Sequence, residues 1–244
     1  MLVREGNARS SDVDRRLACT LAAIAGALNT AAFHAVGFFS ANMTGNVSAL
    51  SDHAALGEWL LGMFYLSIVL AFVLGAAVST LLINAGKRRR IRSIYAVSIL
   101  AEAVLMALLG CACLWLPQAN RGPTLILGLS FLMGLQNAVV TTISGARVRT
   151  THVSGMSTDI GIELSMLFDI ARGRELGVDA APYQLKLRLH AQTVLSFLVG
   201  GIIGVMVYQA IGGRLLFATA SVLLALSLLG IWQALRGDVS VPQA

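Results

Sequence analysis

Seven polar side chains lie in or beside the long apolar runs of this sequence and could bind a small polar solute. They are Asn29, Thr44, Asn46, Glu102, Gln136, Asn137 and Ser154. Amide and hydroxyl groups donate and accept hydrogen bonds, and a carboxyl group can also carry a proton. Because polar groups among apolar residues are costly unless they meet a partner or a watery path, they commonly mark functional sites. We therefore predict that these seven residues form a substrate-binding site.

Most of these residues belong to a short motif that occurs twice. The first copy reads GALNTA and, after a gap, NMTGNVS; the second reads GLQNAV and then HVSGMST. Asn29 corresponds to Asn137 and Thr44 corresponds to Ser154, with a glycine after each hydroxyl residue. The recurrence indicates an internal repeat.

Each copy precedes a segment that is typical of a short helix, residues 47–56 in the first half and 156–168 in the second. The side chains suited to cap the free amides of these helix starts are Thr44, Asn46, Ser154 and Ser157. We predict a broken or re-entrant helix in each half, which must line a cavity or be buried in protein. The alternative is a capped helix that lies along the membrane interface and needs no ligand.

The depth of the polar residues predicts where the site lies. At 1.5 Å per residue, Asn29 lies about 18 Å into its apolar run, Glu102 about 12 to 15 Å, and Asn137 about 20 Å from the opposite edge. All three come near the bilayer middle, so we expect them to converge with Gln136 in one polar cavity. Proton coupling is the natural role of Glu102. The alternative is a neutral Glu102 that forms a hydrogen bond with a neighbouring helix for packing.

The composition indicates a membrane protein. Hydrophobic residues make up 57% of the 244 residues, charged residues only 12%, and the mean hydropathy is +0.77. A soluble domain of this size could not bury so much apolar surface. A membrane-spanning helix needs about 20 apolar residues. The runs that meet this length are 17–39, 59–83, 94–116, 124–146, 189–211 and 215–235. We predict an all-α membrane bundle of six transmembrane helices.

The basic residues predict the orientation of the bundle. Of the 18 Lys and Arg, only Arg121 and Arg214 fall in segments on one side of the six-span arrangement. Because cytoplasmic loops are enriched in Lys and Arg, both termini are predicted to be cytoplasmic, in a bacterial inner membrane. Division of the basic residues among short loops also argues against a nucleic-acid partner.

The six predicted spans divide into two halves of three. The predicted segments are a cytoplasmic head 1–16, a first repeat 17–116, a periplasmic connection 117–123, a second repeat 124–235 and a cytoplasmic tail 236–244. With an odd number of spans each, the two halves run in opposite directions through the membrane. Such inverted repeats are the usual construction of secondary transporters. We expect the halves to superpose by a rotation of about 180° around an axis in the membrane plane.

Motifs of the familiar enzyme classes do not occur in the sequence, and no Cys and His cluster has the spacing of a metal site. An intramembrane hydrolase could use Ser154 with His152 or His190, although this hydroxyl-rich stretch is more typical of helix capping. Asp159 and Glu163 share a helix face near several arginines, which favours a charge network. We expect no catalytic residue, no metal and no cofactor, and therefore no enzyme.

The stretches GALNTAAFHAVGFFSANMTGN and MGLQNAVVTTISGARVRTTHVSGMSTDIG resemble the YoaK family of bacterial six-span membrane proteins, a domain of unknown function. The resemblance covers nearly the whole chain and implies the family's fold, but no activity. Members of this family commonly carry Asp where this chain has Asn29 and Thr where it has Ser154.

We expect the chain to be a secondary transporter or permease that moves a small-molecule solute across the lipid bilayer. Whether it forms a homo-oligomer is left open by the sequence. The alternative is a membrane scaffold, in which the polar motifs only hold the helices together. A transporter needs a water-accessible cavity near the membrane middle, whereas a scaffold is dry there.

Overall fold

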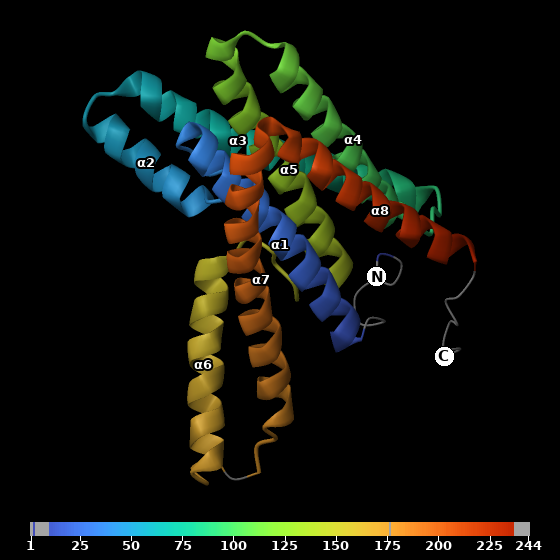
Figure 1. Ribbon diagram of the computed structural model, residues 1–244. Coiled ribbons are helices and arrows are strands. Elements are labelled where there is room, and N and C mark those ends of the chain that lie inside the picture. Colours follow the sequence, from blue (N-terminus) through green and yellow to red (C-terminus); the bar gives the residue numbers. More distant parts are fainter. Residues whose placement is uncertain (1, 3–9, 176, 237–244) are drawn as a thin grey trace.

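The computed structural model describes residues 2, 10–175 and 177–236. The predicted head 1–16 and tail 236–244 thus lie partly outside the described residues. The described chain consists of α-helices, a short 3-10 helix and connecting turns (Figure 1). The helices are α1 (Ser11–Val36), α2 (Met43–Ala55), α3 (Trp59–Arg88), α4 (Ile94–Trp115), α5 (Gln118–Ser144), α6 (Val153–Ala171), α7 (Ala181–Ile211), η2 (Gly212–Arg214) and α8 (Leu215–Leu235).

The helices are apolar on their outer faces. Among the described residues, five helical stretches are long and apolar enough to cross a membrane, and the last of them, Ala181–Leu235, contains both α7 and α8. Large apolar side chains point outward: Leu60 is 90% exposed and Trp115 is 88% exposed. Exposed apolar surface on this scale suits contact with lipid. The protein is an all-α membrane bundle.

Several helices extend beyond the apolar runs that predict them. The segment 117–123, predicted as a connection, mostly forms the first turns of α5, with Pro123 inside the helix. Pro123 is the sixth residue of α5 and has no N–H to donate to the carbonyl of Ala119, one turn earlier. The two predicted short helices are present as α2 and α6, and each begins a few residues earlier than expected. Thr44 and Asn46 therefore lie within the first turn of α2, and Ser154 lies within the first turn of α6, although they were predicted to cap these helices from outside.

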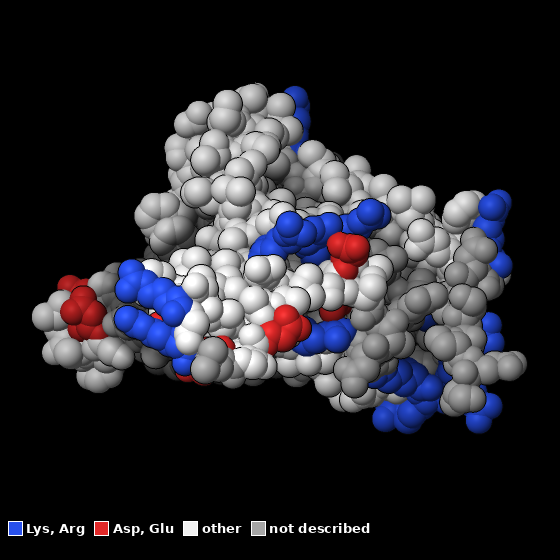
Figure 2. Space-filling view, turned by 90° about the horizontal axis from the view of Figure 1, so that it is seen from below, with Lys and Arg blue, Asp and Glu red and all other residues white. Residues whose placement is uncertain are grey.

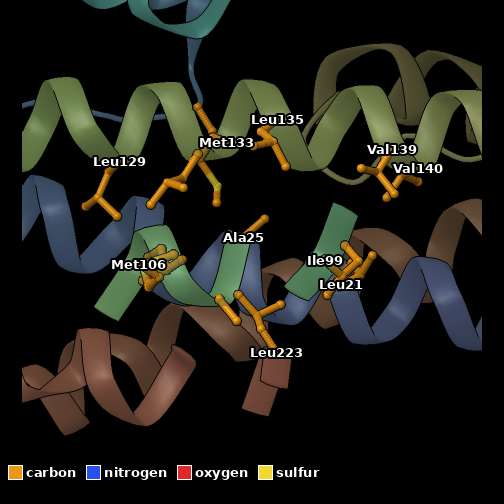
Figure 3. Close-up of a cluster of buried hydrophobic side chains, with 14 of the residues drawn as sticks. Leu21, Ala25, Ile99, Met106, Leu129, Met133, Leu135, Val139, Val140 and Leu223 are labelled. Carbon is orange, nitrogen blue, oxygen red and sulfur yellow. The ribbon is translucent and has the colours of Figure 1, made fainter. Parts of the chain in front are cut away.

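The long helices pack in pairs. α1 packs against α7, α3 packs against α5, and α4 packs against α8 (Figure 1). The shorter helices α2 and α6 pack against the helices that follow them, α3 and α7. Figure 3 shows the core between these pairs, where Ala25 of α1, Met106 of α4, Met133 of α5 and Leu223 of α8 gather. Their side chains are at most 3% exposed.

Four glycines allow two of these pairs to approach closely. In the α1 and α7 pair, a methyl group on Gly26 would overlap the carbonyl of Phe197, and one on Gly200 would overlap the carbonyl of Ala23. In the α3 and α5 pair, Gly75 meets the carbonyl of Phe131 in the same way, and Gly134 meets the carbonyl of Phe72. Small residues at helix contacts are how membrane helices gain close packing. Both pairs therefore use the same type of contact.

Candidate functional site

A central cavity of about 990 Å³ lies among α1, α3, α5 and α7 and the starts of α2 and α6. Both copies of the sequence motif contribute to its lining. The residues that line it and correspond in the two copies are Asn29 and Asn137, Ala41 and Thr151, Asn42 and His152, Met43 and Val153, and Thr44 and Ser154. Phe72 and Phe197, which contact the motif glycines, line it as well. The two motifs thus build one site.

Asn29 and Asn137 hold the chain segments that lead into α2 and α6. The Asn29 side-chain oxygen accepts the backbone N–H of Ala41 at 2.8 Å. The Asn137 side-chain oxygen accepts the Thr151 hydroxyl at 3.0 Å. Ala41 and Thr151 each lie three residues before the hydroxyl residue of their motif copy. Each asparagine therefore fixes the approach to a helix start that faces the cavity.

The two helix starts differ in how their free amides are satisfied. Asn42, before α2, caps the helix, because its side-chain oxygen accepts the Gly45 N–H at 3.2 Å. His152, before α6, makes no side-chain capping hydrogen bond within the described residues. The predicted capping roles of Thr44, Asn46, Ser154 and Ser157 are wrong. For example, the Ser157 hydroxyl donates to the Val153 carbonyl within α6, at 2.9 Å.

Of the seven predicted site residues, four line the cavity: Asn29, Thr44, Asn137 and Ser154. Asn46 does not line it; its side chain is buried and donates to the Phe39 carbonyl at 3.1 Å, which anchors the segment before α2. Glu102 and Gln136 are also absent from the cavity lining. The expected convergence of these two residues with the asparagines is therefore wrong.

Glu102 and Gln136 lie in the helix core instead. Both are 0% exposed, and their side-chain polar atoms have no hydrogen-bond partner among the described residues. On α4, Glu102 lies one turn from Met106; on α5, Gln136 lies one turn from Met133. These methionines point into the same apolar cluster in Figure 3. Depth alone predicted a shared site, but the two side chains face a seam between helices.

The sequence motifs did not predict the charged group of the cavity, Arg149. Arg149 lines the cavity next to His152, whereas its lining contains no Asp or Glu. No hydrogen bond or ion pair joins Arg149 to another described residue. Arg149 lies five residues before Ser154 in a loop that also contains Arg147. Basic residues in such a loop are explained equally well by membrane orientation. Nothing in the sequence distinguished Arg149, as a cavity residue, from the other basic residues of the predicted cytoplasmic segments.

A second cavity, of about 430 Å³, adjoins the first. It shares Arg149 and His152 with the central cavity and is also lined by Arg147, Asp159 and His190. Its neighbourhood holds two charge contacts, one between a helix and the loop before α6 and one between two helices. Asp14 of α1 lies 2.9 Å from Arg147, and Glu163 of α6 lies 3.0 Å from His190 of α7. Both contacts lie at the end of the bundle where α1 begins. Glu163, which the sequence predicted in a charge network with nearby arginines, is 4% exposed and contacts His190 instead.

The described residues contain no group of three or more His, Cys, Asp and Glu side chains that could hold a metal ion. Nor does a hydrogen bond join the Ser154 hydroxyl to His152 or His190 in the part of the chain that is described. The polar side chains that line the central cavity offer hydrogen bonding and charge.

Comparison with known proteins identifies a family for this chain. Neither the curated proteins nor the solved structures give a match to this chain. A family model with the description "Protein of unknown function (DUF1275)" matches residues 17–229, which include both motif copies and all the helices except the ends of α1 and α8. The chain belongs to this family, which is the YoaK family that the two motifs predict.

Proposed function

We propose that the protein is a secondary transporter of a small solute in the bacterial inner membrane. Its six spans are α1, α3, α4, α5, α7 and α8, and its binding site is the central cavity. The observation that carries the proposal is the lining of that cavity, in which corresponding residues of the two motif copies face the same space. A site built at the interface of two repeats is where secondary transporters bind their solutes.

The helix contacts support two inverted halves. Exchanging the halves replaces each of α1 to α4 by its counterpart among α5 to α8, and the reverse. This exchange turns the α1 and α7 pair into the α5 and α3 pair, and it leaves the α4 and α8 pair unchanged. The pairing of α2 with α3 likewise becomes that of α6 with α7. The glycine contacts follow the same exchange, because the contact of Gly26 with Phe197 corresponds to the contact of Gly134 with Phe72. Rocking of such halves around a shared site is the basis of alternating access.

The distribution of charge supports the orientation with both termini in the cytoplasm. Figure 2 looks onto the end of the molecule where α6 and α7 reach furthest, and Lys and Arg are spread across this face with fewer Asp and Glu. A positive face of this kind belongs on the cytoplasmic side. The second cavity then leads from the central site toward the cytoplasm.

The experiment that tests the proposal is labelling of a cysteine in the cavity. With Cys19, Cys111 and Cys113 replaced by alanine, Thr44→Cys will react with a membrane-impermeant thiol reagent from at least one side of the membrane, because Thr44 is exposed in the cavity. The matched control is Ser79→Cys, since Ser79 is 0% exposed in α3. Labelling is read by a gel shift in intact cells and inverted vesicles.

A scaffold would give a different result, because its centre would be dry. If Thr44→Cys is as unreactive as Ser79→Cys from both sides, the transporter proposal is wrong. If both variants are labelled, the background reactivity is too high. The labelling is then repeated at a lower temperature at which Ser79→Cys does not react, and the reaction of Thr44→Cys is read under that condition.

Proton coupling through Glu102 stays a prediction. Retaining a carboxyl group without a hydrogen-bond partner in a membrane core is costly, which supports a role beyond packing. Glu102→Gln keeps the size and polarity of the side chain but removes the titrating group. We expect this variant to fold and insert normally and to lose the pH dependence of transport, measured as uptake into proteoliposomes with and without a pH gradient. Unchanged pH dependence would assign Glu102 to structure alone.

A further inference from the structure

We propose that the central cavity binds a small anion, with a carboxylate or another oxyanion as the recognised group. This inference rests on the proposed transport function and names its class of solute. The cavity is asymmetric in a way that favours negative charge, although its shape comes from two corresponding motifs. The second half contributes Arg149 and His152, and the residues at the same distance before the hydroxyl residue in the first half are Phe39 and Asn42.

The first reason is the balance of formal charge. Arg149 is the only Asp, Glu, Lys or Arg in the cavity lining, and it forms no ion pair with a described residue. A cation entering the cavity would meet this guanidinium without a carboxylate to offset it. An oxyanion would instead receive charge-assisted hydrogen bonds, for which the planar guanidinium is well suited. Asp159, the acidic residue that lines the adjoining cavity, does so together with Arg147 and is absent from the central lining.

The second reason is an unused donor on a buried side chain. Asn29 is 6% exposed and lines the cavity. Its oxygen is occupied by the Ala41 N–H, and no described residue accepts a hydrogen bond from its NH₂ group. Asn137 differs, because its NH₂ group donates to the Met133 carbonyl at 2.8 Å. Asn29 therefore presents two N–H donors to whatever occupies the cavity, while its oxygen already accepts the Ala41 N–H.

The third reason is the uncapped start of α6. This helix has 19 residues, and its first backbone N–H groups receive no side-chain cap from His152. The corresponding start of α2 is capped by Asn42. Free N–H groups and the helix dipole make such a start favourable for an anion. Arg149, the Asn29 amide and the start of α6 all line the same cavity and all supply donors.

The test is solute binding by the purified full-length protein in detergent. The probes are acetate, succinate, citrate, phosphate and sulfate, compared with choline and spermidine as cations and with glucose and glycerol as neutral solutes, at equal ionic strength. At least one anion will raise the unfolding temperature, because a ligand that binds the folded state stabilises it. The dissociation constant is then measured by titration of that anion.

Arg149→Gln will weaken binding of that anion by about tenfold or more, since it removes a charged hydrogen bond. Arg149→Lys keeps the charge and will retain part of the affinity. The control is Arg172→Gln, because Arg172 stacks on Phe168 at the far end of α6 and does not line the cavity. This control will bind as tightly as the unmodified protein.

Three results would overturn the anion assignment. The first is stabilisation by cations or neutral solutes only, which leaves the transport proposal intact. The second is an anion that binds Arg149→Gln as tightly as the unmodified protein. If no anion binds at tens of millimolar, the anion class is also rejected, and the reactivity of Thr44→Cys decides separately whether a transport cavity exists.

Discussion

Replacing Gly134 with leucine will abolish the native bundle. The glycine faces the backbone carbonyl of Phe72 in α3, so even a methyl group would overlap backbone atoms that cannot rotate away. The two helices would have to separate along their whole contact. Overpacking of a tight core costs typically about 1 to 3 kcal/mol and more where backbone must move. We expect the upper end of this range or beyond, which is a large part of the stability of a typical protein.

The measurement is size-exclusion chromatography of a fluorescent fusion, with thermal unfolding of any monodisperse protein. The matched control is Gly161→Leu, because Gly161 lies on α6 with no atom within 4 Å of an added Cβ. Gly26→Leu should fail in the same way as Gly134→Leu, since Gly26 meets the Phe197 carbonyl at the corresponding place. A stable, monodisperse Gly134→Leu protein would show that the α3 and α5 contact is not as close as described.

The sequence indicates the place of this contact but not its partner. The repeated stretches GALN and GLQN place a glycine three residues before Asn29 and Asn137, on α1 and α5. The partners of the glycines could not be predicted, because they are carbonyl groups of α3 and α7, which carry no side-chain signature. Spans, short helices and family follow from hydropathy and motif, whereas the choice of partner helix depends on tertiary packing.

The site was predictable to the same degree. Counting residues along a helix gives the depth of a side chain but not the direction it faces, because each residue turns by about 100° around the axis. Asn29 and Asn137 point into the cavity, whereas Gln136, beside Asn137, points into the core. Glu102 was predicted to lie in the site because of its depth. Its side chain instead faces the core, because depth does not determine the direction of a side chain. Arg149 lies in a loop, for which depth has no meaning.

Exchange of Asn29 for aspartate will separate the structural role of this residue from its role toward solute. Aspartate keeps an oxygen that can accept the Ala41 N–H, so the approach to α2 should remain in place. It replaces the free NH₂ group by a negative charge in a cavity whose only formal charge is Arg149. We expect the protein to fold and the affinity for the anion to fall by about tenfold or more, since a donor is lost and like charges repel.

The comparison variant is Asn29→Leu, which adds no charge but leaves the Ala41 N–H without its acceptor. An unsatisfied buried N–H costs roughly 1 to 3 kcal/mol, so this variant will unfold at a lower temperature than Asn29→Asp. Binding is titrated at mildly alkaline pH, where the new carboxyl group is most ionised. Unchanged anion affinity in Asn29→Asp would mean that the solute lies away from Asn29. Tighter binding of choline or spermidine by Asn29→Asp would instead strengthen the assignment, because one added carboxylate would have reversed the charge preference of the cavity.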